Sequence, residues 1–272
     1  MGNLFLGSMS LQGQQSIGFR YRHFSFQSPA LPNDPYAALF QSKQILRRIE
    51  ILGQIKLSKH WSLSCILPYM VSENYSGKTK TSTCGISDPA IIIRRGLYNS
   101  PVSNPPSLFT HSFNASIGLK IPLGAWESHN LLDITPGSGS WDFIAGLDYL
   151  LAIKNSGIRI DGLVKFNNAN SHGEKIGNGF NSNTLIYHKI NTPFVDITPS
   201  AGFFMEAQMK SHLNDYEISG TQGMRIYGNY GLQISRKKLA ANFSTLIPFR
   251  EFGDKTFRNA GIQFLFQFNY SF

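Results

Sequence analysis

The chain has 272 residues, with 25 Lys and Arg against 16 Asp and Glu, so its formal net charge is 25 − 16 = +9. Charged residues make up 15% of the chain, below the roughly 25% usual in soluble domains, whereas aromatic residues reach 13%. The mean hydropathy is −0.15, and no apolar run approaches the roughly 20 residues of a spanning helix, which excludes a bundle of transmembrane helices. Two cysteines, Cys65 and Cys84, are too few for a disulfide scaffold or, alone, a four-ligand zinc site.

The first fifteen residues allow two interpretations. Residues 1–15 read MGNLFLGSMSLQGQQ, and no Lys or Arg precedes Arg20. A secretory signal begins with a basic region, continues with an apolar stretch and ends at small residues. The segment is therefore predicted to be either the remnant of a signal peptide or a short disordered N-terminus, and residues 16–272 are predicted to form a single domain.

Segments with an apolar residue at every second position recur along the chain. This alternation predicts β-strands with one apolar and one polar face. The clearest segments run, in chain order, from Ile49 to Leu57, Trp61 to Tyr69, Phe113 to Ile121, Trp141 to Leu151, Ile158 to Phe166, Val195 to Met205, Phe243 to Phe249 and Ile262 to Phe272. Weaker segments begin at Ser16, Ile86, Asn183 and Met224. Together they predict twelve strands, an even number.

Short and long connections alternate between these segments. Short turns are predicted at 58–60, 154–157, 191–194 and 235–238, with a medium connection at 98–107. Long loops are predicted at 27–43, 72–84, 123–139, 168–181, 208–221 and 251–258. If the N-terminus lies in the periplasm, every short or medium connection is periplasmic and every long loop is extracellular, which is how outer-membrane barrels are built.

Within the strands, charged residues lie almost entirely on the polar face. A charge that faces lipid at mid-membrane costs roughly 2–4 kcal/mol, whereas a soluble β-sandwich carries its Lys and Glu on the outward faces. Because only a closed barrel satisfies all strand backbone groups in lipid, we expect an all-β, closed antiparallel transmembrane β-barrel. The predicted lumen-lining residues, which would set the polarity along a solute's path, are Arg48, Glu50, Arg94, Lys120, Asp142, Arg159, Asp161 and Glu206.

Three motifs carry a resemblance to a known family. They are Gly85-Ile-Ser-Asp-Pro89, Gly118-Leu-Lys-Ile-Pro-Leu-Gly124 and Pro136-Gly-Ser-Gly-Ser-Trp-Asp-Phe143. With them the chain resembles, in strand order and over most of its length, the outer-membrane proteins of the meta-pathway of phenol degradation, although Ser87, Leu123 and Ser138 depart from the family's motifs. The resemblance implies a barrel near the fatty-acid and aromatic-compound channels, and hence a passive transporter or channel for a small hydrophobic or aromatic compound.

Two other functions stay open, namely a lipid-modifying barrel enzyme and a structural or adhesive barrel whose loops bind partners. The enzyme is disfavoured because no Ser, His and orienting residue share one strand face. Ser171 and His172 are neighbours in a long loop, which is common by chance, and the carboxylates of Asp88 and Asp142 are expected to pair with Arg94 or Lys120. We therefore predict no enzymatic activity.

The sequence also indicates which cofactors and binding partners to expect. It contains no phosphate-binding glycine motif and no Cys/His cluster with metal spacing, so we expect no cofactor and no metal. Its basic residues are spread along the chain, which argues against nucleic acid and fits contacts with anionic lipid headgroups. We expect an outer-membrane location, contact with outer-membrane lipid, passage of a small-molecule solute, and recognition of the terminal Phe272 by the barrel assembly machinery.

Overall fold

The protein is described by a computed structural model that covers residues 15–27, 42–77, 79–100, 109–126, 135–214, 216–253 and 259–272. The predictions for residues 1–14, for most of the connections 27–43, 98–107 and 251–258, and for part of the loop 123–139 lie outside this part of the chain. No helix that could span a bilayer is found among the described residues.

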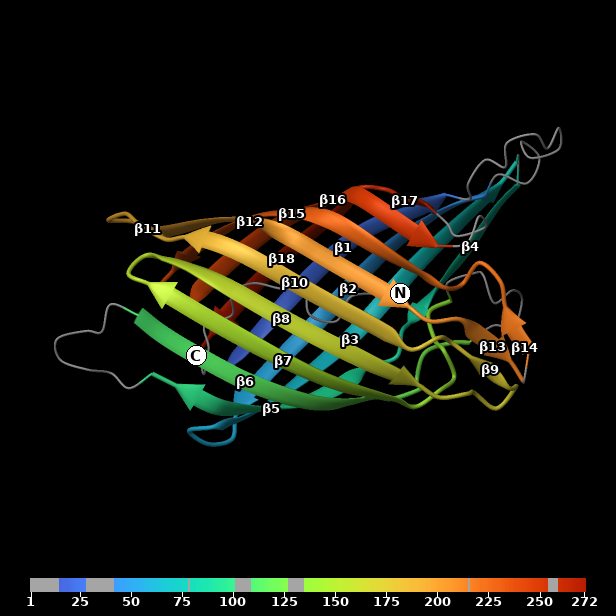
Figure 1. Ribbon diagram of the computed structural model, residues 1–272, viewed down its shortest axis with the longest axis horizontal. Helices are drawn as coiled ribbons and strands as arrows, with labels where there is room; N and C mark the ends of the chain where they lie inside the picture. Colours follow the sequence, from blue (N-terminus) through green and yellow to red (C-terminus); the bar gives the residue numbers. More distant parts are fainter. Residues whose placement is uncertain are drawn as a thin grey trace.

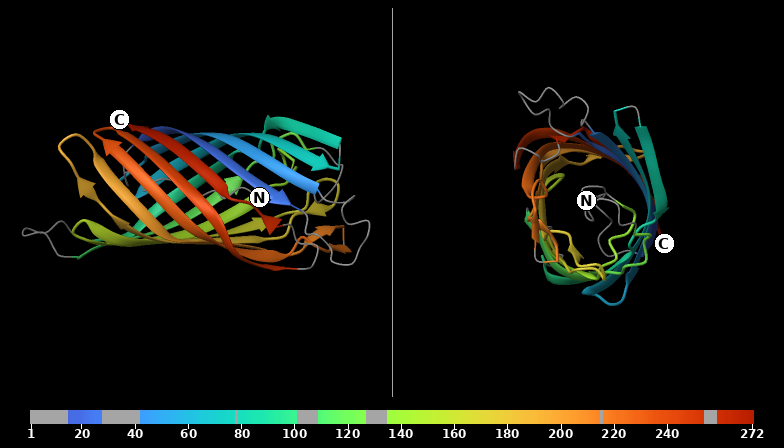
Figure 2. Two further views of the ribbon diagram at one scale, coloured as in Figure 1. Left: turned by 90° about the horizontal axis from the view of Figure 1, so that it is seen from above. Right: turned by 90° about the vertical axis from the view of Figure 1, so that its right-hand side faces the viewer.

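Twelve long strands form a closed antiparallel barrel, as predicted from the alternation (Figure 1). Viewed from its right-hand end in Figure 1, the sheet forms a ring (Figure 2). Each of the twelve long strands pairs with the next long strand along the chain. The six short strands β4, β9, β11, β13, β14 and β17 are not counted among the twelve. The ring consists of β1 (Ser16–Gln27), β2 (Ser42–Lys56), β3 (Trp61–Ser76), β5 (Ala90–Asn99), β6 (Phe109–Lys120), β7 (Asp142–Ile153), β8 (Ser156–Asn167), β10 (Gly179–His188), β12 (Asp196–Gln208), β15 (Gly223–Arg236), β16 (Leu239–Gly253) and β18 (Gln263–Ser271).

The first and last strands pair with each other and close the barrel, as the prediction of a closed barrel requires. β1 pairs with β18 from Ser16↔Ser271 to His23↔Phe264. The backbone N–H of Phe272 donates to the carbonyl oxygen of Gln15 at 3.0 Å, so pairing continues to the last residue. The closed ladder leaves no open edge to face lipid.

Among the described connections, the short ones lie at one end of the barrel and the long ones at the other, as predicted. The end with the long connections carries extra strands, because β3 and β4 (Thr79–Ile86) form a hairpin beyond the ring, and β9 (Glu174–Lys175), β13 (Ser211–Leu213) and β14 (Tyr216–Ile218) form a small sheet (Figure 1). Two short strands, β11 (Ile190–Asn191) and β17 (Asn259–Ala260), extend the pairing of β12 and β1. Lys210, which directly precedes β13, donates a 2.6 Å hydrogen bond to Glu217 of β14. This bond lowers the pKa of the Glu217 carboxyl.

The predicted loop 72–84 is therefore mostly a hairpin, and β5 begins at Ala90 instead of near Ile86. The sequence did not predict β4 because neither of its faces is buried. Residues of β4 are exposed or half-buried on both faces, so this strand has no buried face that would impose an alternating sequence.

The outer surface of the ring is apolar and the inner surface is largely polar. On β6, for example, Ile117 is 65% exposed while its neighbour Ser116 is 6% exposed. The same contrast holds on β18, where Phe264, Phe266 and Phe268 are exposed and Gln267 is buried. Such an outward apolar band is the lipid-facing surface of an outer-membrane barrel.

Removal of Phe272 should lower the amount of barrel in the outer membrane far more than removal of residues 1–7. The terminal ring stacks on Tyr270, with centroids 6.4 Å apart, and the Phe272 backbone extends the closing ladder. Quantitative immunoblots of outer-membrane fractions from the two truncations would measure this. Equal levels would mean that Phe272 is an ordinary frayed end.

Candidate functional site: the barrel interior

Three arginines on adjacent strands surround one buried carboxylate. Arg20 and Arg22 of β1 donate hydrogen bonds to Glu50, which is fully buried. Arg48 of β2 forms an ion pair with the same carboxylate, with 2.8 Å between Arg48 Nε and Glu50 Oε1. We call these four residues the arginine cluster. Arg22 lies directly opposite Arg48 in the β1–β2 ladder, an arrangement of like charges that is destabilising without a counter-charge.

The three motifs that carried the family resemblance meet in space around Asp88 and Lys120. Lys120 Nζ lies 2.9 Å from Asp88 Oδ2 and 2.7 Å from Asp142 Oδ2. Asp88 also accepts hydrogen bonds from the backbone N–H groups of Gly124 and Ser138, both at 2.9 Å. The predicted pairing of the two aspartates is thus with Lys120, while Arg94 lies near Asp148 instead, at 3.6 Å.

Two glycines let the segments that follow β6 and precede β7 touch each other. A Cβ atom on Gly137 would overlap the carbonyl group of Gly124, and one on Gly124 would lie 2.7 Å from the Gly137 Cα. The N–H of Gly137 donates to the carbonyl oxygen of Ala125 at 2.7 Å. Segments 121–126 and 135–141 are therefore held together, with Asp88 fastening both to the start of β5, and they lie within the outline of the ring (Figure 2).

Asp88→Asn should release these two segments while the barrel still assembles. The change removes the carboxylate charge from hydrogen bonds to Gly124, Ser138 and Lys120, and charge-assisted bonds of this kind contribute about 1.5–3 kcal/mol each. Amide hydrogen exchange in peptides covering 121–126 and 135–141 should become about tenfold faster or more. Asp196→Asn, at the opposite end of the barrel, is the control, and unchanged exchange in Asp88→Asn would contradict the fastening role.

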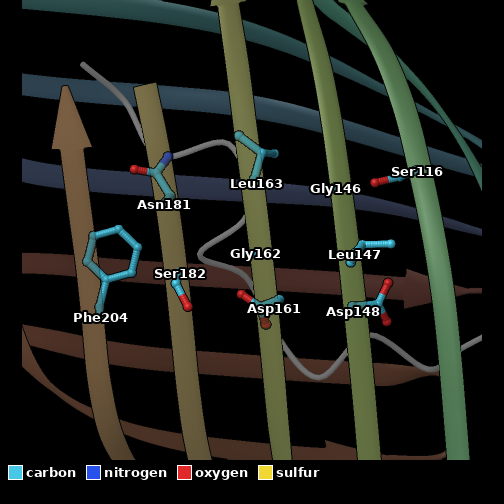
Figure 3. A pocket seen from close by; sticks show the side chains of 10 residues that line it. All are labelled: Ser116, Gly146, Leu147, Asp148, Asp161, Gly162, Leu163, Asn181, Ser182 and Phe204. Carbon is cyan, nitrogen blue, oxygen red and sulfur yellow. The ribbon is translucent and has the colours of Figure 1, made fainter. Parts of the chain in front are cut away.

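A second pair of carboxylates lies on β7 and β8. Asp148 and Asp161 are direct cross-strand partners; Arg159 Nε lies 3.0 Å from Asp161 Oδ1, and Asn114 donates to Asp148 at 2.8 Å. The cavity that both carboxylates line has a volume of about 10 Å³ (Figure 3). This is room for about one water molecule, which is too small for a solute.

The remaining predicted residue, Glu206, is on β12. It accepts from Arg225 at 3.2 Å and from the hydroxyl of Tyr227 at 3.0 Å, and Arg225 also lies 3.5 Å from Glu251. The structure thus places the eight predicted residues in four separate charged groups on the interior wall, not in one site. That they set the polarity of a solute's path stays a prediction.

The interior wall also carries apolar side chains that the alternation did not predict. We call Phe24, Phe26, Leu46 and Met70 the aromatic patch and Phe204, Tyr227, Leu246 and Leu265 the second patch. Ala260 packs against both. A third group consists of Ile66, Ala90, Ile92, Ile144 and Leu163. The signal for the aromatic patch was present in the sequence, since Phe24 and Phe26 share a face with Arg20 and Arg22.

Among the described residues, no third group completes a catalytic triad with the loop pair Ser171 and His172. Ser171 Oγ lies 3.1 Å from His172 Nδ1, and the imidazole stacks on Trp126, with centroids 4.2 Å apart. The nearby carboxylate of Glu174 accepts from Trp126 and Asn170, so it does not orient the histidine. Among the described residues there is no group of His, Cys, Asp and Glu that could hold a metal ion.

A closed twelve-stranded barrel with an outward apolar band and short turns at one end is an outer-membrane protein. No protein-family model and no curated protein sequence matches the chain. Among solved structures it is similar to the COG4313 outer membrane channel from Pseudomonas putida F1, with a TM-score of 0.70, 11% identity and coverage of 97% of each chain. This confirms the predicted family resemblance at the level of the fold.

Two further likenesses are weaker. The β domain of the Bordetella autotransporter BrkA has a TM-score of 0.48 and 13% identity over 94% of this chain and 100% of that chain. LpxR from Salmonella typhimurium has a TM-score of 0.41 and 11% identity over 94% of this chain and 100% of that chain. Both are too distant to inform function.

Proposed function

We propose that the protein is an outer-membrane channel for a small solute that has an apolar part. The observation that carries this proposal is the composition of the interior wall. The aromatic patch and the second patch are joined through Ala260, and charged groups lie beside them. A barrel that served only as an anchor would have no need of apolar side chains inside, where they contact no lipid.

The apolar patches would favour a solute with an aromatic or aliphatic portion, because removing that portion of the solute from water contributes about 25 cal/mol per Å² of apolar surface. The charged groups would keep the rest of the wall polar and could form hydrogen bonds with polar groups of the solute. The fold likeness to the Pseudomonas putida channel supports a channel over an anchor, and the solute class rests on the wall alone.

Liposome swelling tests this function with two zwitterions, of which one carries a phenyl ring where the other carries a hydroxyl group. We expect liposomes containing the purified protein to swell faster in isosmotic phenylalanine than in isosmotic serine, although phenylalanine is larger. Phe204→Ala, which removes an interior ring of the second patch, should abolish the advantage. Phe203→Ala, on the lipid face with a 59% exposed side chain, is the matched control. Swelling no faster than in protein-free liposomes would refute the proposal.

The lipid-modifying alternative has a separate prediction. Because Glu174 does not orient His172, we expect no release of fatty acid from phospholipid by the purified protein. Thin-layer chromatography of the lipid after incubation would measure this. Turnover that disappears in both Ser171→Ala and His172→Ala would establish the enzyme instead.

A further inference from the structure

We infer that a group of basic side chains on the outer surface of the barrel binds the phosphate of a phosphorylated glycolipid in the outer leaflet, whose acyl chains lie along the apolar band. We call this group the outer basic patch; it consists of His23, Lys43, Arg47 and Lys80 and lies on β1, β2 and β4 (Figure 1). The inference goes beyond the proposed function, because it concerns the outer surface and holds whether or not solutes pass through the interior.

The patch begins where the apolar band ends. The last uncharged outward rank of β1–β4 consists of the successive cross-strand partners Tyr21, Ile49, Tyr69 and Ile86. In the next outward rank toward the long connections, His23 lies opposite Arg47. Outward charges are costly at mid-membrane and nearly without cost at the interface, so this rank marks the edge of the hydrocarbon. Long connections of such barrels are extracellular, which places the patch at the headgroups of the outer leaflet.

The side chains of the patch are arranged around Glu73 and Tyr75. Arg47 Nη1 lies 3.2 Å from Glu73 Oε2, and Lys80 Nζ lies 2.8 Å from Glu73 Oε1. Lys43 and Lys80 are both cross-strand partners of Tyr75, and Lys80 Nζ lies 5.4 Å from the centroid of the Tyr75 ring. A guanidinium has five donor hydrogens and an ammonium three, so the contacts with Glu73 orient both cations without using up their donors.

The charge and exposure of the patch suit a phosphate. Beyond the last uncharged rank, the described outward positions of β1–β4 hold three Lys or Arg residues and one carboxylate, a formal net charge of 3 − 1 = +2 with histidine neutral. The side chains of Arg47 and Lys80 are 40% and 50% exposed, so a headgroup can reach them. A phosphate monoester carries about −1.5 to −2 charges at pH 7 and three acceptor oxygens, which match guanidinium and ammonium donors.

The apolar surface beside the patch favours a lipid over a free anion. Ile49, Ile51 and Leu67 are exposed on the outer face of the adjoining ranks. On β18, Phe264 is the direct neighbour of His23, with ring centroids 6.4 Å apart. A lipid whose phosphate lies on the patch would therefore continue along the apolar band with its acyl chains, whereas inorganic phosphate would contact the patch alone.

Native mass spectrometry of the purified full-length protein in detergent micelles tests the inference. The probes are lipid A with both phosphates and the same lipid A after enzymatic dephosphorylation, in buffer without divalent cations. We expect the phosphorylated lipid to bind about tenfold more tightly or better, because each basic residue near a membrane surface adds to the attraction of anionic headgroups. Equal affinities would overturn the inference. Inorganic phosphate at matched ionic strength should not displace the lipid, and displacement would contradict the lipid as occupant.

Variants locate the site. Arg47→Gln combined with Lys80→Gln should remove most of the preference for the phosphorylated lipid. Arg95→Gln is the matched control, because Arg95 also faces outward but lies beside Trp61, directly after the short turn 58–60, with 5.2 Å between its guanidinium carbon and the ring centroid. If the double variant does not assemble, Lys43→Gln takes its place and should weaken the preference. A preference that survives these changes, or that Arg95→Gln lowers equally, would overturn the inference.

Discussion

Glu50→Ala should destabilise the barrel by about 3–5 kcal/mol, because removal of one partner of a buried ion pair leaves uncompensated charge. Here the loss would remove the buried carboxylate with which three guanidinium groups form ion pairs. The urea concentration at the midpoint of unfolding, measured in lipid vesicles, would show the effect as a large decrease.

Glu73→Ala is the control for this change. Glu73 also makes two ion pairs, with Arg47 and Lys80, but these partners are 40% and 50% exposed. Exposed pairs contribute little because water and salt screen them, so its midpoint should stay near that of the native protein. A Glu50→Ala midpoint as high as that of Glu73→Ala would mean that the arginine cluster is not desolvated.

Ile117→Arg should block assembly, whereas Ser116→Arg should be tolerated. Ile117 points out of the barrel on β6 and is 65% exposed, so an arginine there would place a charge in the apolar part of the bilayer at a cost of about 2–4 kcal/mol. Ser116 points inward and lines the cavity shared by Asp148 and Asp161, where an added guanidinium has carboxylate partners. Heat-modifiability on gels measures the folded fraction, and equal folding of both variants would refute the register of β6.

The barrel could be predicted from the sequence because a membrane imposes strict alternation on every spanning strand. The pattern from Ile262 to Phe272 predicted the terminal strand, and the requirement that a barrel in lipid be closed implied its pairing with the first strand. Beyond the bilayer this constraint ends. The strand β4 of the hairpin and the small sheet at the same end lie outside the ring of twelve strands, and their sequences carry no comparable signal.

The interior was predicted less completely, for two physical reasons. Alternation identifies the face on which Arg48 or Asp142 lies, but their partners depend on contacts between distant segments, as when Asp88 binds Gly124 and Ser138. The interior also tolerates apolar side chains. Phe24 and Phe204 occupy positions that a simple alternation of apolar outside and polar inside assigns to polar residues.

The central claim is that the inside of this barrel is a path for solutes, and single-channel current through a barrel with one interior cysteine tests it most directly. In a Cys65→Ser, Cys84→Ser background, Ser200→Cys would place a thiol on the inward face of β12, and Ala201→Cys would place one on the outward face. A negatively charged, thiol-reactive reagent should reduce the current steps of Ser200→Cys and leave those of Ala201→Cys unchanged. The absence of current steps, or an equal response of both variants, would contradict the account.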